Sequence, residues 1–377
     1  AALPIVQGTS FSFIPIMIPL AAGKGVDGLA AIFTGVFIGG LFHIFLGIFV
    51  RKIRFALPPL VTGLVIMMIG LSLIRVGVQY AAGGPETVGT PEYGSLLNWS
   101  TALLVIFVTL GLKFFGRGML SVSAVLIGIL AGYAYAILIG ILPISTIAAS
   151  WNNAAAFALP QPFKYGFEFS TAAIIGFALM AFVSAIETVG DVSATTKSGA
   201  GREATDREIQ GATYADGLGS TIAAIFGAMS NTSLSQNVGL IAMTGIMSRQ
   251  VVTIGALFLI ICGLIPKVGG LIGSMPIEVL GGGVIVMFGM VVAAGVSILS
   301  DVNWNRRNMV IFAIALSIGL GLQLEPSTIA SLPDTPRILL ASGMLPAALI
   351  VIILNLALPA ELSEESAEAL SDHFDQD

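Results

Sequence analysis

The chain has 377 residues, of which 56% are hydrophobic and only 10% are charged, and its mean hydropathy is +0.98. Because a typical soluble domain is about 25% charged, this composition excludes a soluble enzyme, a nucleic-acid binder and a disordered chain. The formal net charge of −5 depends on seven acids in the segment 361–377, which we expect to form a solvated acidic tail.

Long apolar runs follow one another along most of the chain. A bilayer crossing needs about 20 such residues, and about a dozen runs reach or approach this length. They are residues 4–22, 29–49, 57–78, 97–115, 122–139, 170–195, 212–229, 236–247, 251–272, 277–299, 309–322 and 339–358. We therefore predict an all-α, multi-pass membrane protein. The single cysteine, Cys262, excludes a disulfide framework and a cysteine zinc site.

Two of these runs are associated with polar breaks that resemble each other. The letters TSFS at 9–12 match TSLS at 232–235, and GLVIMMIG at 63–70 matches GGVIVMFG at 282–289. The two similar offsets predict a duplicated unit of about 220 residues, and paired interrupted helices in two halves indicate a transporter site. Extended backward, the repeat predicts two further spans before Ala1, hence about 14 spans in two inverted halves of seven.

Lysine and arginine are unevenly distributed between the two sides that alternate crossings define. Eleven of them, including Lys113 and Lys197, fall on one side, and five, including Lys24, fall on the other. Because positive charge marks cytoplasmic loops, the first side is predicted to be cytoplasmic. The loops 81–98 and 142–164 are then extracellular, and the protein belongs to the inner or plasma membrane.

Ionisable residues inside apolar runs are the first candidates for function. Glu187 and Asp191 lie four residues apart in the run 170–195 and therefore share one helix face. Two carboxylates on one low-dielectric face repel each other, so one of them is expected to hold a proton, as in a proton-coupled carrier. The alternative is that these acids mark a helix end. Asp216 has two similar interpretations, a site residue or an interfacial helix cap.

Further candidates lie at the interrupted runs and inside one apolar run. Gln236 begins a half-helix after the polar stretch 230–235, and its carboxamide offers both a donor and an acceptor to the edge of a planar heterocycle. Phe11 is able to stack on such a ring, with simple packing as the alternative. For His43 a helix-packing hydrogen bond is favoured over proton transfer, and Glu278 is expected at the membrane interface.

These motifs together resemble those of the nucleobase–ascorbate transporter family, also called nucleobase:cation symporter-2. The segment QNVGLIAMTG at 236–245 resembles the family signature, and ETVGD at 187–191 resembles its acidic motif in the eighth span. The segment ADG at 215–217 resembles the ninth-span motif, and QGTSF at 7–11 resembles the start of the third span. The resemblance covers nearly the whole chain except the acidic tail, and the first two spans, which carry a Gln-His motif in the family, would precede it.

The resemblance implies a 7+7 inverted-repeat fold with a core domain and a gate domain. It also implies two short antiparallel strands where the third and tenth spans are broken. In the first repeat the core would be 1–55 and the gate 56–140, followed by an extracellular loop at 141–165. In the second repeat the core would be 166–273 and the gate 274–360, before a cytoplasmic tail at 361–377.

The resemblance also implies roles for individual side chains. Glu187 would accept hydrogen bonds from the substrate's ring N–H groups, and Gln236 would bind the opposite edge. Phe11 would stack on the ring, and backbone at Ser235 would complete the site. The proton-coupling and supporting network would comprise Asp191, Asp216, Asn237 and Thr244.

Gln at 236 and Asp at 191 resemble the xanthine and urate branch, whereas uracil carriers of the family tend to have Glu and His there. The function implied is proton-coupled uptake of an oxidised purine, without a metal, a nucleic-acid partner or any cofactor beyond the proton; a homodimer is left open. A uracil or other nucleobase permease is the alternative. An anion transporter of the same fold is less suited, because the carboxylate of Glu187 repels anions. No clustered nucleophile and base indicate an enzyme.

Overall fold

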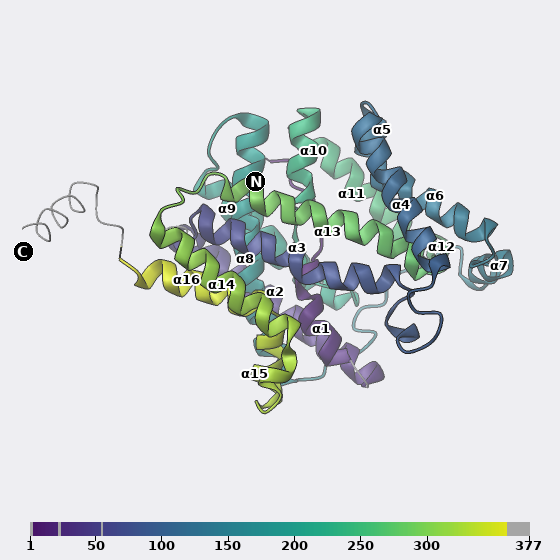
Figure 1. Ribbon diagram of the computed structural model, residues 1–377, viewed down its shortest axis with the longest axis horizontal. Coiled ribbons are helices and arrows are strands. Elements are labelled where there is room, and N and C mark those ends of the chain that lie inside the picture. The colour runs from purple at the N-terminus through teal and green to yellow at the C-terminus, as the bar shows by residue number, and fades with distance from the viewer. Residues whose placement is uncertain (1–2, 22–23, 54–55, 360–377) are drawn as a thin grey trace, which may run out of the picture.

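The computed structural model describes residues 3–21, 24–53 and 56–359, so the predicted tail at 361–377 lies outside the described residues. The chain is mainly helical (Figure 1). The first helices are α1 (Ile14–Ala21), α2 (Gly25–Ile53), α3 (Pro59–Ala81), α4 (Leu96–Phe115), α5 (Met119–Val122), α6 (Ala124–Leu138) and α7 (Ile144–Asn153). They continue with α8 (Thr171–Ala200), α9 (Asp206–Ile225), α10 (Gln236–Thr244), α11 (Arg249–Gly263), α12 (Pro266–Gly273), α13 (Ile277–Leu299), α14 (Arg306–Leu324), α15 (Asp334–Ala341) and α16 (Met344–Ala357). The strands are β1 (Gln7–Thr9) and β2 (Asn231–Ser233), and the 3-10 helix η1 (Phe11–Phe13) follows β1.

A helix lies at each of the predicted apolar runs. By length and composition, six of the described helices suit a bilayer crossing, or up to eight if each of two bent pairs counts as one span. The helix α10 has only 9 residues, which is too short for a bilayer crossing of its own. The larger total of about a dozen spans inferred from the apolar runs therefore stays a prediction.

Two of the predicted spans are bent, and one predicted loop is partly helical. The run 251–272 is not one rod, because α11 and α12 meet at 86°; Pro266, which has no N–H to donate, cannot continue the ladder of α11. The helices α15 and α16 meet at 80°, where Gly343 has a φ of +68° that glycine adopts without steric cost. The segment 141–165, predicted as an extracellular loop, contains α7, which packs against α12.

The helices divide into two groups by their packing. In the first group α2 packs along α8 and α9, and α8 also contacts α10 and β2. In the second group α3 packs along α13, which also contacts α4 and α6, while α16 packs on α3 and α14. Figure 1 shows α3 and α13 side by side across the molecule, with α4 and α6 at one end and α14 and α16 at the other.

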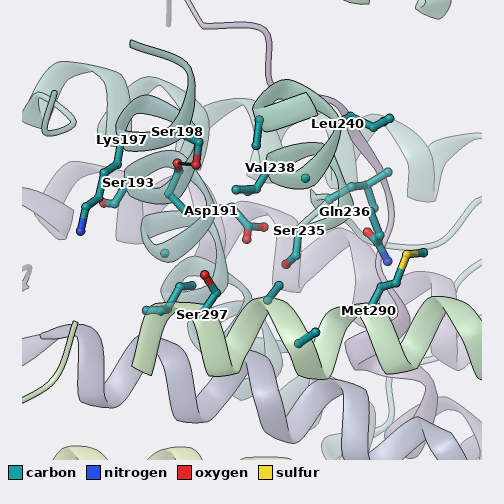
Figure 2. Close-up of a pocket in the computed structure, with 18 of the residues that line it drawn as sticks. Asp191, Ser193, Lys197, Ser198, Ser235, Gln236, Val238, Leu240, Met290 and Ser297 are labelled. Carbon is teal, nitrogen blue, oxygen red and sulfur yellow. Dashed lines mark hydrogen bonds between the residues drawn. The ribbon is translucent and has the colours of Figure 1, made fainter. Parts of the chain in front are cut away.

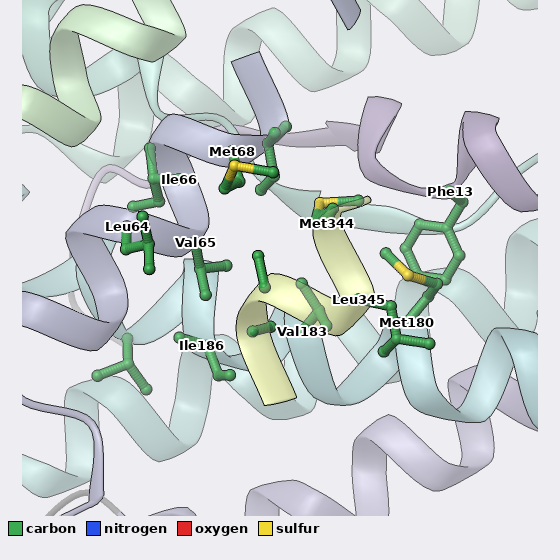
Figure 3. Close-up of a cluster of buried hydrophobic side chains, with 14 of the residues drawn as sticks. Phe13, Leu64, Val65, Ile66, Met68, Met180, Val183, Ile186, Met344 and Leu345 are labelled. Carbon is green, nitrogen blue, oxygen red and sulfur yellow. The ribbon is translucent and has the colours of Figure 1, made fainter. Parts of the chain in front are cut away.

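A buried apolar cluster joins the two groups (Figure 3). Phe13 of η1 and Met180 and Val183 of α8 belong to it, together with Met68 of α3 and Met344 of α16, and each of these side chains is at most 2% exposed. Lipid is as apolar as these side chains, so close van der Waals packing rather than transfer out of water stabilises such a contact in a membrane. The cluster fixes the position of α8 against α3 and α16.

The contact between α3 and α13 is close because glycines face the partner helix. Gly63, Gly70 and Gly77 recur at seven-residue intervals on α3, and a Cβ atom added at any of them would meet α13 within about 3 Å. Gly295 on α13 faces α3 in the same way. Small residues at these positions let the backbones of membrane helices approach each other closely.

We expect Gly295→Ala to destabilise the protein. An added Cβ atom would lie 2.5 Å from the Met67 nitrogen and 2.8 Å from the Gly63 carbonyl oxygen, and forcing two backbones apart costs about 1–3 kcal/mol. Gly289→Ala on the same helix is the matched control, because nothing lies within 4 Å of its Cβ position. Thermal unfolding of the purified variants in detergent measures the difference, and equal melting temperatures would contradict the close contact.

The start of α9 is stabilised by charge. Thr205 and Glu208 form a capping box, and the Arg202 guanidinium donates to both carboxylate oxygens of Glu208 at 2.6 and 2.9 Å. These hydrogen bonds from Arg202 lower the pKa of Glu208 to about 2. The contribution to stability is therefore complete above the ordinary pKa of a glutamate, near 4.3, and is lost as the pH falls toward 2.

Candidate functional site

The two interrupted segments meet as a two-stranded antiparallel sheet. Strand β1 pairs with β2, and the pairing extends through hydrogen bonds from Ser10 N to Ser230 O at 2.8 Å and from Leu234 N to Val6 O at 3.0 Å. Because the strands are antiparallel, the helices that follow them, η1 with α1 and α10, lead away in opposite directions. Polar backbone of this kind is tolerated at membrane depth only inside protein or beside a cavity.

Hydroxyl groups from this region donate to the acids of α8. Thr232 donates to Oε2 of Glu187 at 3.2 Å, and Ser12 donates to the same oxygen at 3.5 Å. One turn further along α8, Ser233 donates to Oδ2 of Asp191 at 3.0 Å. Successive residues of β2 therefore bind two acids that are four residues apart.

Asp216 joins the same network from α9. Its Oδ2 accepts a hydrogen bond of 2.5 Å from Thr188, which follows Glu187 on α8. The exposed fractions of Glu187, Asp191 and Asp216 are 5%, 2% and 0%. No ion pair between described residues reaches any of the three, and in the same part of the chain no group of three or more metal-ligating side chains is placed to hold an ion.

A cavity of about 1180 Å³ lies against this network (Figure 2). Asp191 of α8 lines it together with Ser235 and Gln236 at the start of α10 and with Phe11 of η1. The facing side comes largely from α13, where Met290 points toward Gln236. One side of the cavity is thus polar, whereas the α13 side is rich in methionine and alanine.

Two buried polar atoms beside the cavity form no hydrogen bond within the described residues. They are Oγ of Ser235 and Oδ1 of Asp191, in side chains that are 3% and 2% exposed. Figure 2 shows this hydroxyl and this carboxylate close to each other on the cavity side. A buried polar atom without a partner costs about 1–3 kcal/mol. Binding a water molecule, a proton or a polar ligand atom here would remove this cost.

The structure places the remaining predicted residues in different surroundings. Glu187 is not among the residues that line the cavity, whereas Asp191 is. Asn237 donates to the Pro4 carbonyl at 2.8 Å and so joins α10 to the segment before β1. Thr244 is exposed in the last turn of α10; its hydroxyl donates to the Leu240 carbonyl and accepts from Ile246 N just beyond the helix, and no hydrogen bond between described residues joins it to the acids.

Two ionisable side chains take no part in the hydrogen bonds described above. His43 of α2 is 1% exposed, and its Nε2 has no partner among the described residues. The helix-packing hydrogen bond expected of His43 is therefore not made by Nε2. Glu278 lies in the first turn of α13. The sequence-based prediction missed the hydroxyls of Ser12, Thr232 and Ser233 as partners of the acids, although all three stand in or beside the matched polar breaks.

Membrane-crossing helices, two interrupted segments that meet in a short sheet and a partly polar cavity between helix groups are features of a membrane transporter. The chain belongs to the Permease family, whose profile matches residues 1–328. It is 32% identical over 371 residues to the xanthine permease XanQ of Escherichia coli K12, which covers 96% of this chain and 78% of that protein. It is 34% identical over 358 residues to the uric acid permease PucJ of Bacillus subtilis 168, covering 94% and 78%. The resemblance to the xanthine and urate branch is confirmed.

Two solved structures share the fold. The transmembrane domain of a cyanobacterium bicarbonate transporter, BicA, matches with a TM-score of 0.56 at 15% identity, over 94% of this chain and 85% of that chain. SLC26A9 matches with a TM-score of 0.59 at 14% identity, over 93% and 57%. At such identities the likeness concerns the fold alone. Together with the apolar helices, the family makes this chain a multi-pass protein of the plasma membrane.

Proposed function

We propose that this chain is a proton-coupled permease that takes up an oxidised purine, xanthine or urate, by alternating access. The relatives XanQ and PucJ are named as permeases for xanthine and uric acid. One observation carries the proposal: Gln236, Asp191, Ser235 and Phe11 line a single cavity. A carboxamide, a carboxylate, a hydroxyl and an aromatic ring therefore border the same space, and an oxopurine offers polar edges and an aromatic face to match them.

Within this proposal Glu187 is the main substrate anchor, although in the arrangement described above Asp191, and not Glu187, lines the cavity. Among the described residues its two hydrogen bonds, from Ser12 and Thr232, both reach Oε2, which leaves Oε1 for a ring N–H of the substrate. Phe11 stacks on the substrate ring. Its edge-to-face contact with Phe288 of α13, at 5.2 Å between ring centroids, holds the Phe11 side chain in place for this. Backbone at Ser235 completes the site.

We further propose that the two helix groups are the moving parts. The core domain, 1–55 with 166–273, contains the first group, and the gate domain, 56–140 with 274–360, contains the second, in a fold of two inverted repeats. Asp191, Asp216 and Asn237 form the proton-coupling and supporting network. Thr244 has the least support as a member, because it is exposed and its hydrogen bonds among the described residues reach only Leu240 and Ile246.

Gln236 is expected to set the preference among nucleobases. Its carboxamide presents a donor and an acceptor, whereas a glutamate presents acceptors only. We expect unlabelled xanthine and urate to compete with labelled xanthine for uptake much better than uracil does. In Gln236→Glu the ranking should shift by about 5- to 150-fold, the equivalent of mispairing one buried polar group. Gln161→Glu, at an exposed loop position, is the matched control and should keep the wild-type ranking.

Each outcome of this competition separates two interpretations. Uptake of uracil in preference to xanthine would contradict a purine substrate and leave the transporter assignment intact. An unchanged ranking in Gln236→Glu would remove Gln236 as the selector. Competition by bicarbonate or sulfate, but by no nucleobase, would instead favour an anion carrier of the fold shared with BicA.

A further inference from the structure

An ion pair spans one end of the cavity. Lys197 lies in the last turn of α8, Asp301 lies just after α13, and Nζ of the lysine is 2.7 Å from Oδ2 of the aspartate. Both residues line the cavity. In Figure 2 Lys197 lies on the opposite side of the view from Gln236, so the cavity extends between them.

This ion pair joins the two helix groups. Lys197 belongs to the group of α2, α8 and α9, and Asp301 follows α13 in the group of α3 and α13. Two further ion pairs, Arg202–Glu208 and Arg337–Asp334, each stay within one group. Lys197 is also six residues beyond Asp191 on the same helix, so a displacement of the acids of α8 would carry Lys197 with it.

We propose that Lys197 and Asp301 form a reversible tie between the two groups at the cytoplasmic end of the substrate path. The tie is formed in the arrangement described above and broken in the opposite one. This inference rests on the proposed function, since alternating access moves one group of helices against the other around the binding site. A contact of 2.7 Å between atoms of the two groups does not survive a relative shift of more than an ångström or two.

The chemistry of the pair suits a contact that breaks in every cycle. The two side chains are 57% and 47% exposed, so water solvates both charges when they separate. Exposed ion pairs contribute little to stability, and removing this one is expected to change the balance between the two arrangements by no more than about fivefold.

A reversible cross-link tests the tie. In a background without the native thiol, Cys262→Ser, the variant Lys197→Cys/Asp301→Cys is bridged by a bis-methanethiosulfonate with a short alkyl spacer. The bridge replaces a weak contact by covalent bonds that thermal motion does not break. Uptake into proteoliposomes is expected to fall to background on bridging and to return when a reductant cleaves the bridge.

The matched control is the pair Arg202→Cys/Glu208→Cys. The native side chains there form an exposed ion pair of similar length, 2.6 Å, but within one helix group. Bridging this pair should leave uptake close to that of the unbridged protein. Full uptake by the bridged 197–301 protein would overturn the proposal, and so would an equal loss of uptake in the two bridged proteins.

Spin labels on the same two cysteine pairs provide a measurement that needs no substrate. The 197–301 pair is expected to give two distances, one for each arrangement, and the 202–208 pair one. A single 197–301 distance would overturn the tie even if uptake is normal. If neither the wild-type protein nor the Cys262→Ser parent takes up xanthine or urate, the proposed function fails, while the distance measurement still decides whether the two groups separate at this point.

Discussion

Glu187→Gln is expected to abolish uptake while leaving the protein folded in the membrane. The substitution keeps the size of the side chain, but it replaces one acceptor oxygen with an NH₂ donor that cannot accept from a ring N–H. A hydrogen bond to a charged group contributes about 1.5–3 kcal/mol, which corresponds to about 10- to 150-fold in affinity. Donation from Ser12 and Thr232 to the remaining oxygen can persist, so the fold should survive.

Uptake of labelled xanthine into proteoliposomes measures this effect, with melting temperature and size-exclusion profile as the test of folding. Glu278→Gln is the matched control: it removes an acid in the first turn of α13 that takes no part in the network around Glu187. Wild-type uptake by Glu187→Gln would remove this residue from the site and leave Asp191, which does line the cavity, as the anchor.

The positions of the helices follow from composition alone, because an apolar run of sufficient length has few alternatives in a bilayer. The directions of the helices do not follow in the same way. Nothing in the hydropathy of 251–272 distinguishes one rod from the 86° bend before Pro266. The helix α7 was also missed, since it is short and its mixed composition resembles that of a loop.

The sequence identifies candidate site residues because acids and amides are rare in apolar runs. The sequence does not show which of the acids reaches the cavity. Glu187 and Asp191 share a helix face, and only the rotation of α8 against β2 and α13 exposes one of them to the cavity. The pairing of Lys197 with Asp301 depends on a contact between residues that are 104 positions apart, which no local pattern signals.

Thr244 illustrates a different limit. It was assigned to the supporting network through the family signature at 236–245, which carries residue types and spacing but no information about exposure. The helix α10 lines the cavity with residues between Gln236 and Ala242, but the Thr244 side chain in its last turn is exposed. Asn237, near the start of the same helix, is 8% exposed and bonded to the Pro4 carbonyl.

Uptake is expected to depend on a proton gradient, and three buried acids are the reason. Glu187, Asp191 and Asp216 are at most 5% exposed, and the hydrogen bonds they accept come from hydroxyl groups rather than from cations. A buried carboxylate without a cation is costly, and three within one network cost more than one. Binding a proton, or a substrate that donates N–H groups, relieves this cost, so the two ligands are expected to bind together.

A membrane potential of about 100 mV supplies about 2.3 kcal/mol for each proton, enough for roughly 50-fold accumulation of a neutral substrate. In energised vesicles a protonophore is therefore expected to reduce accumulation to the external concentration, and replacing sodium by potassium should have no effect. Strict dependence on sodium would contradict proton coupling.

Asp216→Asn should lose accumulation while the vesicles still equilibrate substrate, because the amide keeps a hydrogen bond with Thr188 but cannot release a proton. Accumulation by Asp216→Asn at the wild-type level would indicate that Asp191 or Glu187, the remaining acids of the network, carries the proton instead.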